Sequence, residues 1–266
     1  MTADDQERPI HYFTRLAADR YEATEHTGGG WNPAEQHIAP VLGLMVHAIE
    51  CDASRRAAAP LAIARLTYDI LGTLPIGEFQ TQVATVRGGR TIELVEVTLS
   101  HGGRPAVVLR AWLLKEFDSQ DLSGTSFAAI DPPESMPTFD PTEMWPGGFV
   151  GSVEVWRSEV QPGAAAWWVR TDVGLVEDEP VSATARAVGL FDLANGITPR
   201  VSPAEAFYPN TDLTAHLFRE PSGEWLGFAT TVSFGPRGAG VTHSVLHDEH
   251  GPFGTIAQML TVRPRR

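Results

Sequence analysis

The chain has 266 residues, of which 42% are hydrophobic and 20% are charged, as is typical of a globular protein of one or two domains. Its formal net charge of −13 argues against binding to nucleic acid or an anionic membrane, because both need clustered Lys and Arg. The single Cys51 excludes an intrachain disulfide and is typical of a reducing compartment. No basic leader before an apolar core and no apolar run of about 20 residues occur. We therefore expect a soluble, cytoplasmic protein.

The first predicted element is a helical turn or strand over Arg15–Thr27 that ends in three glycines. A helix follows over Gln36–Ser54, with Pro40 in its first turn, where a missing N–H costs little. Apolar residues lie on nearly every side of this helix, so we expect other elements to wrap it. Four segments rich in Val, Ile, Thr, Leu and aromatics follow, the last three separated by Gly-Gly turns typical of hairpins. The predicted strands are Ala62–Leu71, Glu78–Arg87, Thr91–Ser100 and Ala106–Lys115.

The composition changes over Phe117–Trp145, which carries four prolines and six acidic residues but no Lys or Arg. Such a segment is typical of a connector that runs over the surface. We predict a first unit over residues 1–116, an acidic, proline-rich linker over 117–148, and a second unit over 149–266.

The second unit repeats the layout of the first. Gly43-Leu44 recurs as Gly189-Leu190 at an offset of 146, and Leu66-Thr67 as Leu213-Thr214 at 147. Such matches in order indicate a tandem duplication. Each half is predicted as one long helix on a curved antiparallel sheet, an α+β fold in which the two sheets pair edge to edge. The elements of the second half are a helix over Ser182–Gly196 and strands near Gly151–Val160, Ala164–Asp172, Pro209–Arg219, Glu224–Phe234, Gly240–Leu246 and Gly254–Val262.

Asp192 lies inside the helix predicted over Ser182–Gly196, which is apolar on nearly every side. A buried carboxylate is costly unless it is paired, hydrogen-bonded or next to a wet cavity. Its counterpart in the first half is Val46, and two further polar exchanges occur on strands of the same half. Asn210 and Thr211 stand where the first half has Ile63 and Ala64, and Gln258 stands where it has Ala111.

The economical interpretation is that these polar side chains converge under the helix and hold a water molecule, with Asp192 as the base. The alternative is that each is a separate buried polar group with its own partner. Under that alternative, Asn210 and Thr211 are strand-start residues that bind nearby backbone.

Other kinds of site are less well supported. His243, His247, Asp248 and His250 resemble a metal cluster, but strand residues four apart lie about 13 Å apart, so we expect no metal and no cofactor. Cys51 has no evident basic partner in the sequence and is predicted to be inert.

Several segments resemble the acyl-CoA thioesterases of the double hotdog fold, the acyl-CoA thioesterase II type. In the first half these are HIAPVLGLMVHAIE, ARLTYDILGTLPIGEF and VRGGRTIELVEVTL; in the second they are GLFDLANG, YPNTDLTAHLFREPSGEWLG and DEHGPFGTIAQ. The resemblance implies a catalytic Asp on the second helix, a Thr at the start of the next strand and a Gln on the last strand. Asp192 and Gln258 match the Asp and the Gln. Asn210 departs from the Thr, with Thr211 one residue further on.

By this resemblance the protein hydrolyses a fatty-acyl or other acyl thioester of coenzyme A. The alternative is an acyl or acyl-CoA binding protein that keeps the scaffold without catalysis. The resemblance further implies acyl-CoA as the partner and a homo-oligomer of paired sheets. A second departure is Ile38-Ala39-Pro40, where related sequences commonly carry His-Gly-Gly.

Overall fold

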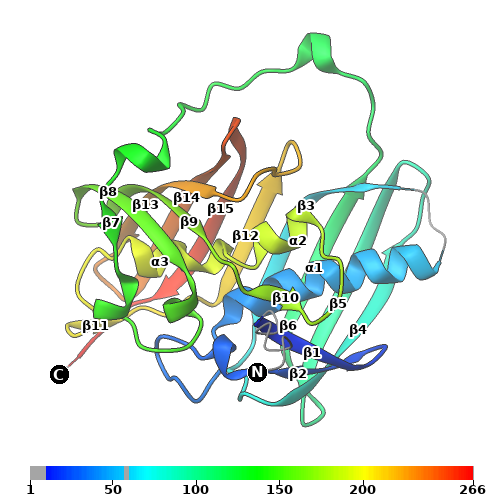
Figure 1. Cartoon of the computed structure of the whole chain (residues 1–266), viewed down its shortest axis with the longest axis horizontal. Helices are drawn as coiled ribbons and strands as arrows, with labels where there is room; N and C mark the ends of the chain where they lie inside the picture. The colour runs from blue at the N-terminus through cyan, green and yellow to red at the C-terminus, as the bar shows by residue number, and fades with distance from the viewer. Residues whose placement is uncertain (1–9, 57–59, 266) are drawn as a thin grey trace, which may run out of the picture.

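The computed structural model describes residues 10–56 and 60–265, in which all strands except β11 and β16 form one continuous 14-stranded sheet (Figure 1). Its order is β10-β1-β2-β4-β5-β6-β3-β12-β15-β14-β13-β9-β8-β7. Within these residues no helix is long and apolar enough to cross a membrane. The first half contains β1 (His11–Ala17), β2 (Arg20–Ala23), α1 (Ile38–Arg55), β3 (Ala62–Ile70), β4 (Glu78–Arg87), β5 (Ile92–His101) and β6 (Arg104–Leu114).

The strands of the second half follow one another outward from the middle of the sheet in the same way as those of the first half. The exception is β10, which pairs with β1 at the outer edge of the first half. The second half contains β8 (Glu154–Gln161), β9 (Ala164–Arg170), β10 (Gly174–Val176), α2 (Ala183–Val188), α3 (Ala194–Ile197), β12 (Asp212–Leu217), β13 (Leu226–Phe234), β14 (Ala239–Asp248) and β15 (Gly251–Thr261). The short β11 (Ala206–Phe207) pairs with β16 (Arg263–Pro264) outside the main sheet.

The two halves of the sheet meet where β3 and β12 pair antiparallel, which confirms the predicted edge-to-edge pairing. Thr67 lies opposite Thr214, its own counterpart at an offset of 147, and Leu66 lies opposite Ala215. A local twofold axis therefore passes through the joint, because each residue near it pairs with a residue of the duplicate strand.

The two helices cross at a second self-matched position. A Cβ atom built on Gly43 would lie 2.5 Å from the carbonyl oxygen of Ala185 and 2.9 Å from the Cα of Gly189, the counterpart of Gly43. No side chain fits at such a distance, so a glycine is required there. The helices run antiparallel. Glu50 lies after Gly43 in the chain but contacts Ser182, which lies before Gly189, through a hydrogen bond of 2.7 Å from Ser182 Oγ to Glu50 Oε1.

Helix α1 is enclosed as expected. All eleven residues from Ala39 to Ile49 are buried, and the ring of His37 caps the first turn by accepting from the N–H of Ala39 at 3.1 Å. In Figure 1 this helix lies across the strands of the first half.

The prediction of one continuous helix over Ser182–Gly196 is wrong. The segment consists of α2, a single 3-10 turn at Phe191–Leu193, and α3. The break follows Gly189, the residue in contact with Gly43, and glycine is a poor helix former. For Arg15–Thr27 the strand alternative is confirmed, because β1 and β2 form an antiparallel hairpin, and a 3-10 turn follows at Glu25–Thr27.

The acidic connector runs as an extended arc over its first part (Figure 1, green). Its later part packs on the second half: β7 (Thr138–Phe139) pairs with β8, and Met136 and Trp145 are buried. The boundaries after residues 116 and 148 stay a prediction, and residues 1–9 of the first predicted unit lie outside the described residues.

We predict that Gly43→Ala lowers the free energy of unfolding by about 1–3 kcal/mol, because the added methyl meets backbone atoms that cannot rotate away. Urea denaturation followed by fluorescence measures the loss. Gly189→Ala is the matched control, since a Cβ there would meet nothing closer than 3.2 Å. Equal losses in the two variants would contradict the crossing as described.

Candidate functional site

The carboxyl group of Asp192 lies in the 3-10 turn between α2 and α3 and is only 5% exposed. Two side-chain amides donate to the same oxygen, Oδ1: Asn210 Nδ2 at 2.6 Å and Gln258 Nε2 at 2.7 Å. No hydrogen bond from the described residues reaches Oδ2. One oxygen of the carboxyl group is thus fixed and the other is left for a further partner.

Burial raises the pKa of Asp192 to about 7, and the hydrogen bonds from Asn210 and Gln258 act in the opposite direction. Neutral amides do not compensate a buried negative charge as an arginine would. A group with this pKa exchanges its proton near neutral pH, as a general base must.

Three of the four predicted site residues come together, from three separate elements. Asn210 precedes β12, where its backbone pairs with that of Leu260, and Gln258 lies inside β15. Thr211 is not brought to the carboxyl group. Its side chain is exposed, and its backbone bonds Met259 and Ile70. Asn210, and not its neighbour, contacts Asp192.

His37 also lies beside the Asp192 carboxyl group, although it was not among the residues predicted from the sequence. Its Nδ1 lies 3.9 Å from Asp192 Oδ2, and its ring packs on Phe149 with 4.6 Å between centroids. Burial lowers the pKa of His37 to about 4, so the ring is neutral. Because Nδ1 accepts from Ala39, the proton lies on Nε2.

A signal for His37 was present in the duplication. At an offset of 146 its counterpart is Ala183, so the polar-for-apolar comparison, applied from the first half to the second, marks His37 together with His47, whose counterpart is Leu193. The antiparallel crossing of the helices then explains why a first-half residue lies beside Asp192.

A small cavity of about 30 Å³ adjoins His37 and is lined by apolar and aromatic groups that include Leu193 and Ile197. Trp31 and Trp145 close it, with 4.6 Å between their ring centroids, and the indole of Trp145 donates to Gly196 O at 2.9 Å. The same two tryptophans also line a cavity of about 510 Å³, so they separate the small cavity from a larger one. The small cavity has room for about one or two water molecules.

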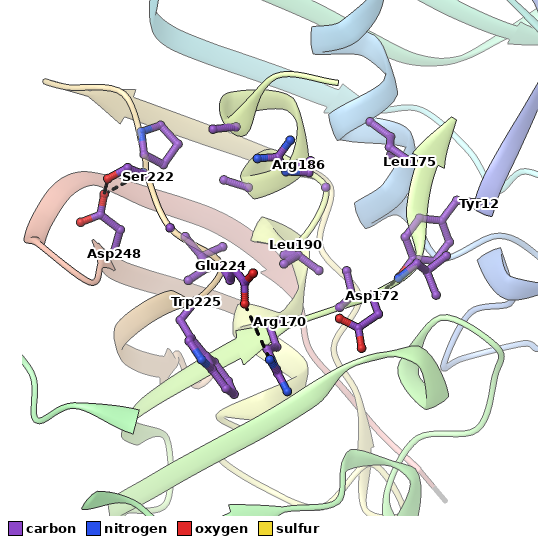
Figure 2. A pocket seen from close by; sticks show the side chains of 18 residues that line it. Tyr12, Arg170, Asp172, Leu175, Arg186, Leu190, Ser222, Glu224, Trp225 and Asp248 are labelled. Atoms are coloured by element: carbon purple, nitrogen blue, oxygen red, sulfur yellow. Dashed lines mark hydrogen bonds and ion pairs between the residues drawn. The ribbon is translucent and has the colours of Figure 1, made fainter. Parts of the chain in front are cut away.

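Another cavity, of about 290 Å³, lies along the outer face of α2 (Figure 2). Ala187 and Leu190 are on its apolar side, and Arg170, paired with Glu224 at 3.8 Å, is at its charged rim. Its lining contains neither Asp192 nor the two amides, and neither does that of the small cavity, which adjoins the carboxyl cluster only through His37.

The prediction that Cys51 lacks a basic partner is wrong. Its Sγ lies 3.5 Å from His47 Nε2 and 3.7 Å from a guanidinium nitrogen of Arg15, and the bond to His47 lowers the pKa of the thiol. Within the described part of the chain, His47, Cys51 and Glu179 are the group whose ligand atoms lie close enough to share a metal ion. The same Arg15 nitrogen lies 2.8 Å from Glu179 and 3.4 Å from His47, so the guanidinium occupies the place of a cation.

Two sequence profiles of acyl-CoA thioesterases match the chain. The profile of the N-terminal domain matches residues 27–114, and that of the C-terminal domain matches residues 132–262. Comparison with curated protein sequences gives no match.

Solved structures of hotdog proteins are similar over nearly the whole chain. A hot dog fold protein from Alicyclobacillus acidocaldarius has a TM-score of 0.75 at 14% identity, covering 95% of this chain and 96% of that one. A putative thioesterase II from Thermobifida fusca has a TM-score of 0.72 at 18% identity, with 94% and 95% covered. An acyl-CoA thioesterase II from Mycobacterium marinum has a TM-score of 0.65 at 13% identity, with 95% and 96% covered. The fold is therefore a double hotdog, as predicted.

The raised pKa of Asp192 predicts a pH-dependent stability cost. The unfolded carboxyl group titrates near 4 and the folded one near 7, so between these values the folded state holds more protons and its stability falls as pH rises. We predict that Asp192→Asn is more stable than the wild type at about pH 8 and that this gain shrinks at about pH 5.5. Thermal unfolding at both pH values measures it. Asp131→Asn, at an exposed site, is the control. A gain independent of pH would exclude titration of Asp192 as the cause.

Proposed function

This chain belongs to the acyl-CoA thioesterase family, and from that membership we propose that it hydrolyses an acyl-CoA thioester with a water molecule activated by Asp192. The water oxygen attacks the thioester carbonyl carbon while Oδ2 of Asp192 takes a proton. The carbon–sulfur bond then breaks, the coenzyme A thiolate leaves and takes up a proton, and the free acid remains. No covalent bond to the protein forms in this scheme.

The observation that carries the proposal is the one-sided binding of the Asp192 carboxyl group. Both amides hold Oδ1, so the group has a fixed orientation and Oδ2 faces the N-terminus of α1. A base that is fixed in one orientation next to its water reduces the entropy lost in the transition state. The pKa of Asp192 near 7 lets it accept a proton and later return it at neutral pH.

The N-terminus of α1 is the best candidate for binding the oxyanion. His37 is the N-cap of this 18-residue helix and carries its ring proton on Nε2, which makes the ring a neutral donor at this helix end. The positive end of the helix dipole favours negative charge at the same place. We propose that the thioester oxygen binds at this end of α1, next to the water held by Oδ2 of Asp192.

Asn210 stands at the position where the acyl-CoA thioesterase II pattern has a Thr. Its Nδ2 donates to Asp192 Oδ1 at 2.6 Å and to the carbonyl of Asp212 at 3.2 Å, so the amide is held from two sides. An amide so held supports the carboxyl group as a hydroxyl would, and we assign Asn210 rather than Thr211 to the site.

One observation favours the alternative of a non-catalytic acyl-CoA binding protein. The cavity beside His37 measures about 30 Å³, which accommodates water but no acyl group unless Trp31 and Trp145 move apart. Hydrolysis and binding of a panel of acyl-CoAs by the pure protein distinguish the two functions. Measurable binding without detectable hydrolysis would favour the binding protein.

For the enzyme we predict that kcat rises with pH around a midpoint near 7 and then levels, because Asp192 must be ionised to accept a proton. Asp192→Asn is expected to lower kcat at least about 100-fold across this range. Initial rates of thiol release over a pH series measure both effects. Unchanged hydrolysis by the Asn variant would exclude Asp192 as the base while leaving the thioesterase activity intact.

The two neighbouring polar residues are expected to respond differently. Asn210→Ala removes a hydrogen bond to the carboxylate and should lower kcat/KM about 10- to 100-fold. Thr211→Ala, which changes an exposed side chain, should stay within about twofold of the wild type. Steady-state kinetics of both variants on one acyl-CoA provide the comparison, and the opposite ranking would place Thr211 in the site.

A further inference from the structure

Two buried polar atoms next to the carboxyl cluster have no hydrogen-bond partner among the described residues. They are Oε1 of Gln258, whose residue is 1% exposed, and Oγ1 of Thr242, whose residue is 0% exposed. Thr242 lies directly opposite Gln258 in the antiparallel pairing of β14 with β15. Opposed residues on one face have Cβ atoms about 4.5–5.5 Å apart, within reach of a hydrogen bond between their side chains.

The first half shows which residues stand at the positions equivalent to Thr242 and Gln258 when there is no carboxyl group to bind. At an offset of 147, Thr242 and Gln258 correspond to Val95 and Ala111, which are likewise opposite one another in the pairing of β5 with β6. Both of these apolar residues are fully buried. The hydroxyl and the amide therefore occur together in the half that carries Asp192, and neither occurs in the other half.

The other hydroxyls of this sheet face already have partners. Thr230 Oγ1 accepts from the indole of Trp167 at 3.0 Å and shares a 2.8 Å hydrogen bond with Ser244. Ser244 lies opposite Ile256, so it is not the cross-strand neighbour of Gln258. Thr242 is therefore the residue opposite Gln258 whose hydroxyl, within the described part of the chain, lacks a partner, as does Oε1 of Gln258.

We infer that Thr242 is a positioning residue: its hydroxyl holds Oε1 of Gln258 through one buried water and thereby keeps Nε2 on Asp192. Leaving both groups unpaired in the core would destabilise the folded state, and bridging them removes this cost. The pairing also selects the amide orientation, because a flipped Gln258 would bring its oxygen against the carboxylate. This inference rests on the role proposed for Asp192.

The consequence is a change in acid–base behaviour as well as in stability. Without the hydroxyl, Gln258 is free to rotate and its hydrogen bond to the ionised Asp192 weakens. That bond lowers the pKa of Asp192, so its loss raises the pKa further above the ordinary value. A hydroxyl with a purely structural role would change stability without moving this titration.

The test compares Thr242→Val, which installs the residue of the first half, with Thr242→Ser, which keeps the hydroxyl. The titration of Asp192 is followed by carbon-13 NMR of its carboxyl signal, assigned by its disappearance in Asp192→Asn, so the readout does not depend on catalysis. We expect Val to move the midpoint upward by about 0.5 unit or more and to lower kcat with little change in KM, and Ser to restore both. An unmoved midpoint in Thr242→Val would overturn the inference.

Two controls separate the possible causes. Ser244→Ala removes a buried hydroxyl from the same strand face and should lower stability without moving the midpoint. Thr198→Val removes another buried hydroxyl without a partner, and a shift there but not in Thr242→Val would assign the amide contact to Thr198 and overturn the inference. Retained hydrolysis in Asp192→Asn would contradict the proposed mechanism, whereas its loss together with wild-type behaviour of Thr242→Val would contradict this inference alone.

Discussion

The backbone contact between Gly43 and Gly189 is the constraint on which the rest of the architecture depends. Helices that approach this closely leave no room for a side chain at Gly43, and Gly43 and Gly189 are counterparts in the two halves. The antiparallel crossing brings the beginning of α1 next to the residues that follow Gly189. His37 therefore lies beside Asp192, and the site is built from both halves of the chain.

The same symmetry gives each residue of the candidate site a counterpart at the equivalent position of the other half, and these counterparts are apolar. The local twofold exchanges Asp192 with Val46 and His37 with Ala183. On the sheet below, Gln258 and Thr242 are exchanged with Ala111 and Val95. At these matched positions one half carries buried polar groups and the other is packed core, so the cost of burying polar groups there falls on one half only.

Asp192 lies at an interruption of the second helix. Helical hydrogen bonding stops at Gly189 and resumes at α3, and the carboxyl group lies in the single 3-10 turn between them. Burial there raises its pKa, so the folded protein carries a stability cost at neutral pH that a neutral side chain would avoid. Such a local loss of stability is typical of sites that serve function, and here the neutral amides of Asn210 and Gln258 offset only part of it.

Much of this protein could be inferred from the sequence alone, because periodicity and duplication are local properties. The enclosed helix α1, the hairpins, the doubled α+β layout and the odd position of Asp192 follow from apolar spacing and from the offsets of 146 and 147. The duplicate comparison also singled out Gln258 and Asn210, since an apolar counterpart marks a polar residue that packing does not need. The same comparison also marked Thr211, the counterpart of Ala64 of the first half, but its side chain points away, because neighbouring residues near a strand face opposite sides. Only the tertiary structure decided that the second helix breaks at the glycine contact and that His37 of the first half faces Asp192 of the second. It also decided that Arg15 and His47 lie beside Cys51. These contacts depend on the angle and register at which two distant segments cross, and a linear sequence read residue by residue carries no direct record of either.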